Sequence, residues 1–87
     1  MQPMTKVVVY TTQYCPYCMQ AKALLKHKGV AFEEVDVGED DAMRARVVEL
    51  SGRRTVPQIF IDDKPIGGYD ELRALDDQGE LDRLLAA

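Results

Sequence analysis

Residues 7–18, VVVYTTQYCPYC, place both cysteines of the chain directly after an apolar run. Residues 6–11 are continuous and rich in β-branched side chains, which predicts a strand covered on both faces. Pro16 predicts the first residue of a helix, because the N–H that proline lacks would have no partner at that position. Cys15 is then the predicted N-cap, and Cys18 lies one turn into the helix.

This placement favours a reactive dithiol. A cysteine at a helix N-terminus has its pKa lowered by unpaired backbone N–H groups and by the helix dipole. Residues three apart on a helix are close enough to form a disulfide with little backbone movement. We therefore interpret Cys15 as the exposed nucleophile and Cys18 as the more buried resolving thiol. Two alternatives stay open: two small core residues, or half of a zinc site, for which His27 is the other candidate ligand.

The composition predicts one globular domain over residues 1–87. Apolar residues make up 46% of the chain and charged residues 30%, and the net charge is −4. This acidity and the lack of a long basic cluster argue against nucleic acid or an anionic membrane as a partner. No apolar run approaches the roughly 20 residues of a membrane span, and no signal peptide is evident. We expect a soluble, cytoplasmic protein.

Helices and strands alternate along the rest of the chain. The expected order is β-α-β-α-β-β-α, with parallel first and second strands and an antiparallel final hairpin. Asp70 is the expected N-cap of the last main helix, and Gly79 separates that helix from a final amphipathic turn or two. The expected elements are a helix over 16–28, an edge strand over 30–37, a helix opening at 39–41 and ending at 51–52, and strands at 58–61 and 64–67.

Three stretches together resemble the glutaredoxin family, in particular its short bacterial members. They are Cys15-Pro16-Tyr17-Cys18, residues 55–61 (TVPQIFI) and residues 67–72 (GGYDEL). The resemblance implies an α/β, thioredoxin-like fold, in which a four-stranded mixed sheet is flanked by helices. It also implies a cis peptide bond before Pro57, beside the cysteines. An ordinary proline at a strand entry is the alternative.

The resemblance further implies a glutathione site. The Val56 backbone would pair with the cysteinyl part of glutathione as an added strand does. The segment from Gly68 to Asp70 would hold the γ-glutamyl end at a helix N-terminus, and Arg54 the glycyl carboxylate. The alternatives are a plain cap for Asp70, a solvated Arg54 and a packing role for Tyr17. The implied glutathione-binding residues are Tyr17, Arg54, Thr55, Val56, Pro57, Gly68, Tyr69 and Asp70.

The function that the resemblance implies is glutathione-dependent thiol-disulfide oxidoreduction, without a metal. Glutathione mixed disulfides and protein disulfides would be reduced through Cys15 and Cys18, and the protein would be a monomer. Ribonucleotide reductase, a client of some relatives, is one candidate client that the sequence does not decide. A thioredoxin-like reductase served by a flavoprotein is one alternative, which the lack of tryptophan disfavours. A glutathione-ligated iron-sulfur carrier is another, which Pro16 disfavours.

Thr12 departs from the family. Many glutaredoxins have a lysine three residues before the first cysteine, where this chain has Thr12. That lysine would help to stabilise the Cys15 thiolate and the glutathione carboxylate. Arg54 and the helix N-terminus are then expected to supply more of the positive potential.

Overall fold

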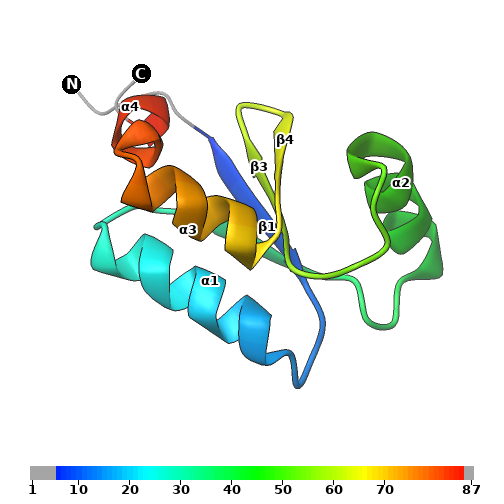
Figure 1. Cartoon of the computed structure of the whole chain (residues 1–87). Coiled ribbons are helices and arrows are strands. Elements are labelled where there is room, and N and C mark those ends of the chain that lie inside the picture. The colour runs from blue at the N-terminus through cyan, green and yellow to red at the C-terminus, as the bar shows by residue number, and fades with distance from the viewer. Residues whose placement is uncertain (1–5, 86–87) are drawn as a thin grey trace.

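A computed structural model describes residues 6–85 and shows the predicted order of elements, with a short additional helix at the end (Figure 1). Gly79 separates that helix from the one before it, as expected. The elements are β1 (Val7–Thr11), α1 (Pro16–His27), β2 (Glu33–Asp36), α2 (Asp41–Ser51), β3 (Gln58–Ile61), β4 (Lys64–Gly67), α3 (Tyr69–Asp77) and α4 (Glu80–Leu85).

The four strands form one mixed sheet in the order β2-β1-β3-β4. Strand β1 pairs in parallel with β2 and antiparallel with β3, and β4 forms a hairpin with β3. The apolar run Val7–Val9 lies in this central position and is buried, as its lack of alternation predicts. Strand β2 is at the edge as predicted, but it is shorter than the predicted range 30–37.

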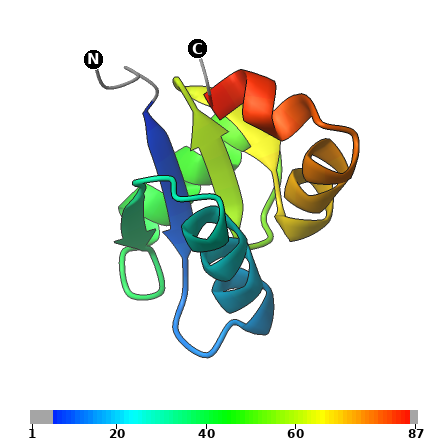
Figure 2. The ribbon, with the colours of Figure 1, turned by 90° about the vertical axis from the view of Figure 1, so that its left-hand side faces the viewer.

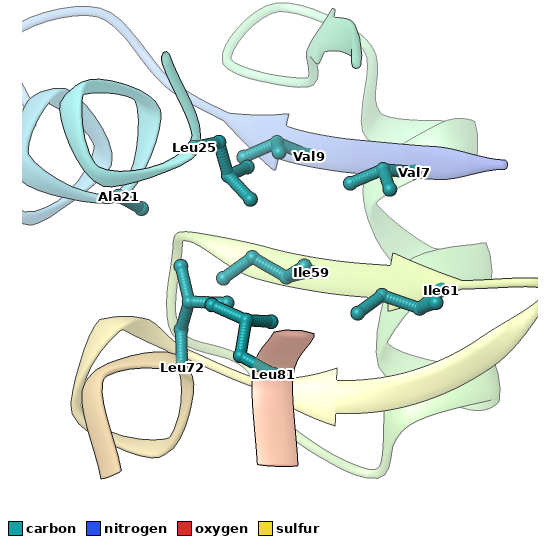
Figure 3. Packing of buried hydrophobic residues seen from close by; sticks show 8 residues of the cluster. All are labelled: Val7, Val9, Ala21, Leu25, Ile59, Ile61, Leu72 and Leu81. Carbon is teal, nitrogen blue, oxygen red and sulfur yellow. The ribbon is translucent and has the colours of Figure 1, made fainter. Parts of the chain in front are cut away.

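Helices cover both faces of the sheet. Helices α1, α3 and α4 lie on one face and α2 lies on the other (Figures 1 and 2). Because side chains alternate along a strand, odd-numbered residues of β1 and β3 pack under α1, α3 and α4, and even-numbered ones face α2. Figure 3 shows the larger cluster, formed by Val7, Val9, Ala21, Leu25, Ile59, Ile61, Leu72 and Leu81. The smaller cluster contains Val8, Val37, Val47 and Phe60.

The start of α3 differs from the prediction. The sequence predicts Asp70 as its N-cap, whereas the structure has Gly68 there and Asp70 in the first turn. The chain turns earlier because Gly67 adopts φ 121°, a conformation that L side chains rarely take. The Asp70 carboxylate still lies at the positive end of the helix dipole.

None of the helices formed by residues 6–85 combines the length and apolar character that a membrane crossing needs.

Candidate active site

Cys15 and Cys18 are joined by a disulfide at the start of α1, and their Cα atoms are 5.1 Å apart. Cys15 is the N-cap residue and Pro16 begins the helix, as predicted. The backbone N–H of Cys18 donates a 3.1 Å hydrogen bond to the Cys15 sulfur. After reduction, the same N–H would stabilise a thiolate at Cys15, because N–H groups at a helix N-terminus carry partial positive charge.

The two cysteines differ in their access to solvent. Cys18 is 1% exposed and packs inside the protein, whereas Cys15 is partly exposed. The turn before Cys15 projects outward: Tyr14 has φ 57° and is almost fully exposed. A thiol or disulfide that approaches from outside therefore meets the Cys15 sulfur first.

The loop between α2 and β3 brings a second backbone segment to the disulfide. The Val56–Pro57 peptide bond is cis, which confirms what the resemblance implies for Pro57. The carbonyl oxygen of Val56 lies 3.8 Å from the Cys15 sulfur. On the other side of this segment, a Cβ atom at Gly68 would lie 3.3 Å from the Pro57 carbonyl oxygen. Glycine at position 68 thus lets the start of α3 approach the Pro57 backbone closely.

These segments enclose a hollow of about 280 Å³. The structure brings together every glutathione-binding residue that the resemblance implies, except Arg54. The Tyr17 and Tyr69 rings both line it, with their centroids 6.4 Å apart. The lining residues are Tyr17, Arg53, Thr55, Val56, Pro57, Gly68, Tyr69, Asp70 and Glu71.

Arg53 and Glu71 line this hollow, although neither is among the site residues predicted from the sequence. The guanidinium of Arg53 forms an ion pair with the Glu71 carboxylate. Its hydrogen bond to Glu71 is the main cause that holds the pKa of Glu71 below the usual 4.5. Two features of the sequence could have pointed to them. Arg53 directly precedes Arg54, and Glu71 is a second carboxylate in the first turn of α3.

Arg54 lies at a different hollow, of about 350 Å³, against α2. The other residues that line it are Asp41, Arg44, Ala45 and Val48. Consecutive residues of this loop therefore face different sides, so that Arg53 and not Arg54 is placed beside Val56 and Gly68.

Thr12 lies beside a third, wider hollow of about 590 Å³. This hollow is lined by Thr12, Gln13, Asp36, Gly38, Glu39, Asp40 and Arg44. Three of these residues carry carboxylates and one carries a guanidinium. A longer side chain at position 12 would thus extend into a mostly acidic environment.

His27, the remaining zinc candidate, is the last residue of α1, at the opposite end from the cysteines. Within the described range 6–85, no three His, Cys, Asp or Glu side chains are grouped so that they could hold a metal ion.

This chain is similar to known proteins over most of its length. The glutaredoxin family model matches residues 7–66. The chain is 54% identical over 82 residues to Glutaredoxin 3 of Escherichia coli, covering 94% of this chain and 99% of that protein. It is 48% identical over 84 residues to a glutaredoxin of Pseudomonas aeruginosa, covering 97% of this chain and all of the other.

Solved structures agree with this match. A buckwheat glutaredoxin–glutathione complex superposes with a TM-score of 0.87 at 32% identity, covering 93% of this chain and 76% of that one. The solution structure of a glutaredoxin from Brucella melitensis superposes with a TM-score of 0.83 at 51% identity, covering 93% of this chain and 88% of that one. The fold is thus thioredoxin-like, and the dithiol at the start of α1 makes the protein a thiol-disulfide oxidoreductase. The chain belongs to the glutaredoxin family.

Proposed function

We propose that this protein uses glutathione to reduce glutathione mixed disulfides and protein disulfides. The observation that carries the proposal is the position of the Cys15–Cys18 disulfide, whose outer sulfur lies 3.8 Å from the Val56 carbonyl at the edge of a hollow. A peptide with a thiol could place its sulfur at Cys15 while its backbone runs along Val56. The buckwheat relative crystallised with glutathione supports glutathione as that peptide.

The proposed glutathione site is the hollow around Val56. Gly68 and Tyr69 supply backbone N–H groups at the start of α3, where a carboxylate is favoured. The exposed Asp70 carboxylate suits an ammonium group. Tyr17, Thr55 and Pro57 complete the walls. Arg54 remains the cation that the resemblance implies, but Arg53 is the arginine that lines the hollow.

Mixed disulfides would be reduced in two exchanges. The Cys15 thiolate attacks the glutathione sulfur of the substrate, the substrate S–S bond breaks, and its electron pair leaves on the substrate thiolate, which takes a proton from solvent. A second glutathione thiolate then attacks the glutathione sulfur bound to Cys15. The products are glutathione disulfide and a regenerated Cys15 thiolate.

Protein disulfides would require both cysteines. Cys15 attacks one sulfur of the protein disulfide, and the other sulfur leaves as a thiol. Cys18 loses its proton and attacks the Cys15 sulfur, which releases the second protein thiol and forms the Cys15–Cys18 disulfide. Two glutathiones reduce this disulfide and leave as glutathione disulfide. The short distance between the cysteines and the burial of Cys18 support its role as the internal resolving thiol.

Cysteine variants test these roles separately. We expect Cys15→Ser to lower turnover of a small glutathione mixed disulfide to the uncatalysed rate, because no other thiol remains accessible. We expect Cys18→Ser to retain that activity within a few-fold and to lose reduction of a protein disulfide. The measurement is NADPH consumption in a coupled assay with glutathione and glutathione reductase. Normal turnover by Cys15→Ser would show that the nucleophile is misassigned.

The reductant needs its own test. We expect glutathione, and not thioredoxin reductase with NADPH, to reduce the oxidised protein. The opposite result would favour the thioredoxin-like alternative.

We also propose that the protein is a single-domain monomer that works in the cytoplasm, where thiols are kept reduced. Glutathionylated and disulfide-bonded proteins would be its clients, with ribonucleotide reductase as one candidate. Size-exclusion chromatography tests the monomeric state. An assay of whether the purified protein reduces ribonucleotide reductase tests this client.

A further inference from the structure

Gln58 is a buried polar residue at the start of β3, opposite Tyr10 of β1. Its side chain is 1% exposed, although glutamine is mostly found at protein surfaces. Because side chains alternate along a strand, it is on the same face of β3 as Phe60. An apolar side chain of similar size would suit this position without a desolvation cost.

The amide of Gln58 is only half satisfied. Its Nε2 donates to the Thr55 carbonyl oxygen at 2.8 Å and to the Thr55 hydroxyl at 3.3 Å. Its Oε1 has no hydrogen-bond partner among the described residues. The orientation is defined, because Oε1 turned toward the Thr55 carbonyl would place two acceptors together. Burial of an amide has a desolvation cost that an apolar side chain would not have, so the feature specific to glutamine here is its hydrogen bonding to Thr55.

The bond from Gln58 reaches the reactive end of the molecule. Thr55 precedes Val56, whose carbonyl oxygen lies 3.8 Å from the Cys15 sulfur, and both residues line the hollow beside Pro57. These residues belong to the connection between α2 and β3, which has no regular secondary structure. The amide of Gln58 therefore links the rigid centre of the sheet to the segment that would contact glutathione.

We propose that Gln58 is a positioning residue. Its buried amide holds the Thr55 carbonyl and thereby orients the Val56 backbone toward the peptide part of the substrate. The inference rests on the proposed glutathione-dependent function and adds a residue that does not touch the substrate. The hydrogen bonds from Gln58 preorganise the binding segment, at the cost of burying an amide.

Gln58→Met tests this role, since methionine is of similar length and has no amide. We expect KM for a small glutathione mixed disulfide to rise about fivefold, as for the loss of one hydrogen bond, with kcat nearly unchanged. The urea midpoint of unfolding should stay the same or rise. Gln58→Asn, which keeps an amide but is one methylene too short to reach Thr55, should raise KM in the same way.

Two controls separate positioning from general effects. Gln78→Met makes the same chemical change at an exposed site and should leave KM unchanged. Val47→Ala should lower the unfolding midpoint through the buried side of α2 without raising KM. An unchanged KM in Gln58→Met, an equal rise in Val47→Ala, or loss of the fold in both Gln58 variants would overturn the proposal. If the unmutated protein shows no glutathione-linked turnover, the proposed function fails and this role fails with it.

Discussion

At the residue scale, the surroundings of Cys15 are asymmetric. On one side its sulfur accepts the Cys18 N–H and lies near the Val56 carbonyl. On the other side, Thr12 and Gln13 border a hollow lined by carboxylates. Position 12 contributes no charge, whereas the N-terminus of α1 places the Cys18 N–H at the sulfur.

Replacing Thr12 with lysine should make Cys15 more reactive. A cation near the sulfur favours the thiolate, so the pH midpoint of Cys15 alkylation should fall and alkylation at neutral pH should quicken about twofold to threefold. The effect is limited because Asp36, Glu39 and Asp40 attract the same lysine. The measurement is the pH dependence of iodoacetamide reaction in a reduced Cys18→Ser background. Thr12→Met, similar in length but uncharged, should react as the parent does, and an equal gain in it would contradict the electrostatic explanation.

The two neighbouring arginines should differ in their effect on binding. Arg53 lines the hollow and pairs with Glu71, whereas Arg54 lies against α2. We expect Arg53→Gln to raise KM for a glutathione mixed disulfide about twofold to fivefold, the range for an exposed charge interaction. Arg54→Gln is the matched control and should change KM little. The reverse result would restore Arg54 as the cation for glutathione.

At the element scale, α2 is held by few buried contacts. Val47 is the buried residue of this helix, and it packs with Val8, Val37 and Phe60. Leu50, only three residues later, is about half exposed. Packing of α2 on the sheet therefore depends on one side of the helix, although apolar residues at 43, 47 and 50 predict a continuous apolar face.

We therefore expect Val47→Ala to cost about 2 kcal/mol in the free energy of unfolding, from lost burial and the cavity left behind. Leu50→Ala on the same helix should cost less than about 0.5 kcal/mol, because the side chain is exposed. Urea denaturation followed by circular dichroism measures both. Equal losses would mean that Leu50 is covered in solution.

At the scale of the whole molecule, ion pairs join elements that are distant in sequence. Lys22 of α1 and the Thr11 hydroxyl both donate to Glu34 of β2. The Lys28 ammonium, after α1, pairs with Asp76 of α3 and Asp82 of α4. The Arg53–Glu71 pair adds a link between the α2–β3 loop and α3. The Glu34 contacts connect α1 with the edge strand β2, whereas the Lys28 and Arg53 pairs connect the helices and the α2–β3 loop with one another.

We therefore expect the free energy of unfolding of the oxidised protein to be highest between about pH 4.5 and 10.5. Hydrogen bonds from Lys22 and Thr11 lower the pKa of Glu34, and Arg53 lowers that of Glu71, both from 4.5. Their contribution is present above pH 4.5 and is lost as the pH falls through the lowered pKa values. Hydrogen bonds to Asp76 and Asp82 raise the pKa of Lys28 from 10.5, so its contribution is fully present below pH 10.5 and is lost as the pH rises through the raised pKa.

Thermal unfolding between about pH 2 and 11 tests this dependence. Because the cysteines of the oxidised protein do not titrate, they leave the profile unaffected. In Glu34→Gln the melting temperature should fall less steeply as the pH is lowered. Because 1 M NaCl screens the ion pairs, it should reduce the loss of stability at both low and high pH. If the melting temperature of Glu34→Gln fell with decreasing pH as steeply as that of the parent protein, the Glu34 contacts would not be the cause of the acid dependence.

The order of the elements could be predicted from the sequence because each signal is local. The run Val7–Val9, the proline at 16 and the glycine at 79 act on the backbone within a few residues of themselves. The family resemblance added the cis bond at Pro57 and most of the residues around the hollow. The short β2 strand and the Gly68 cap differ from the prediction because pairing at the sheet edge and the turn at Gly67 decide those ends.

Local patterns and the family resemblance are enough to predict the dithiol at the start of a helix, the α/β architecture and the family. Three-dimensional packing is needed to show that Arg53 faces the hollow while Arg54 does not, that Glu71 pairs with Arg53, and that Gln58 is buried with its amide on Thr55. The physical reason is that the direction of a loop side chain depends on packing against residues distant in sequence. A pattern read along the chain does not contain those contacts.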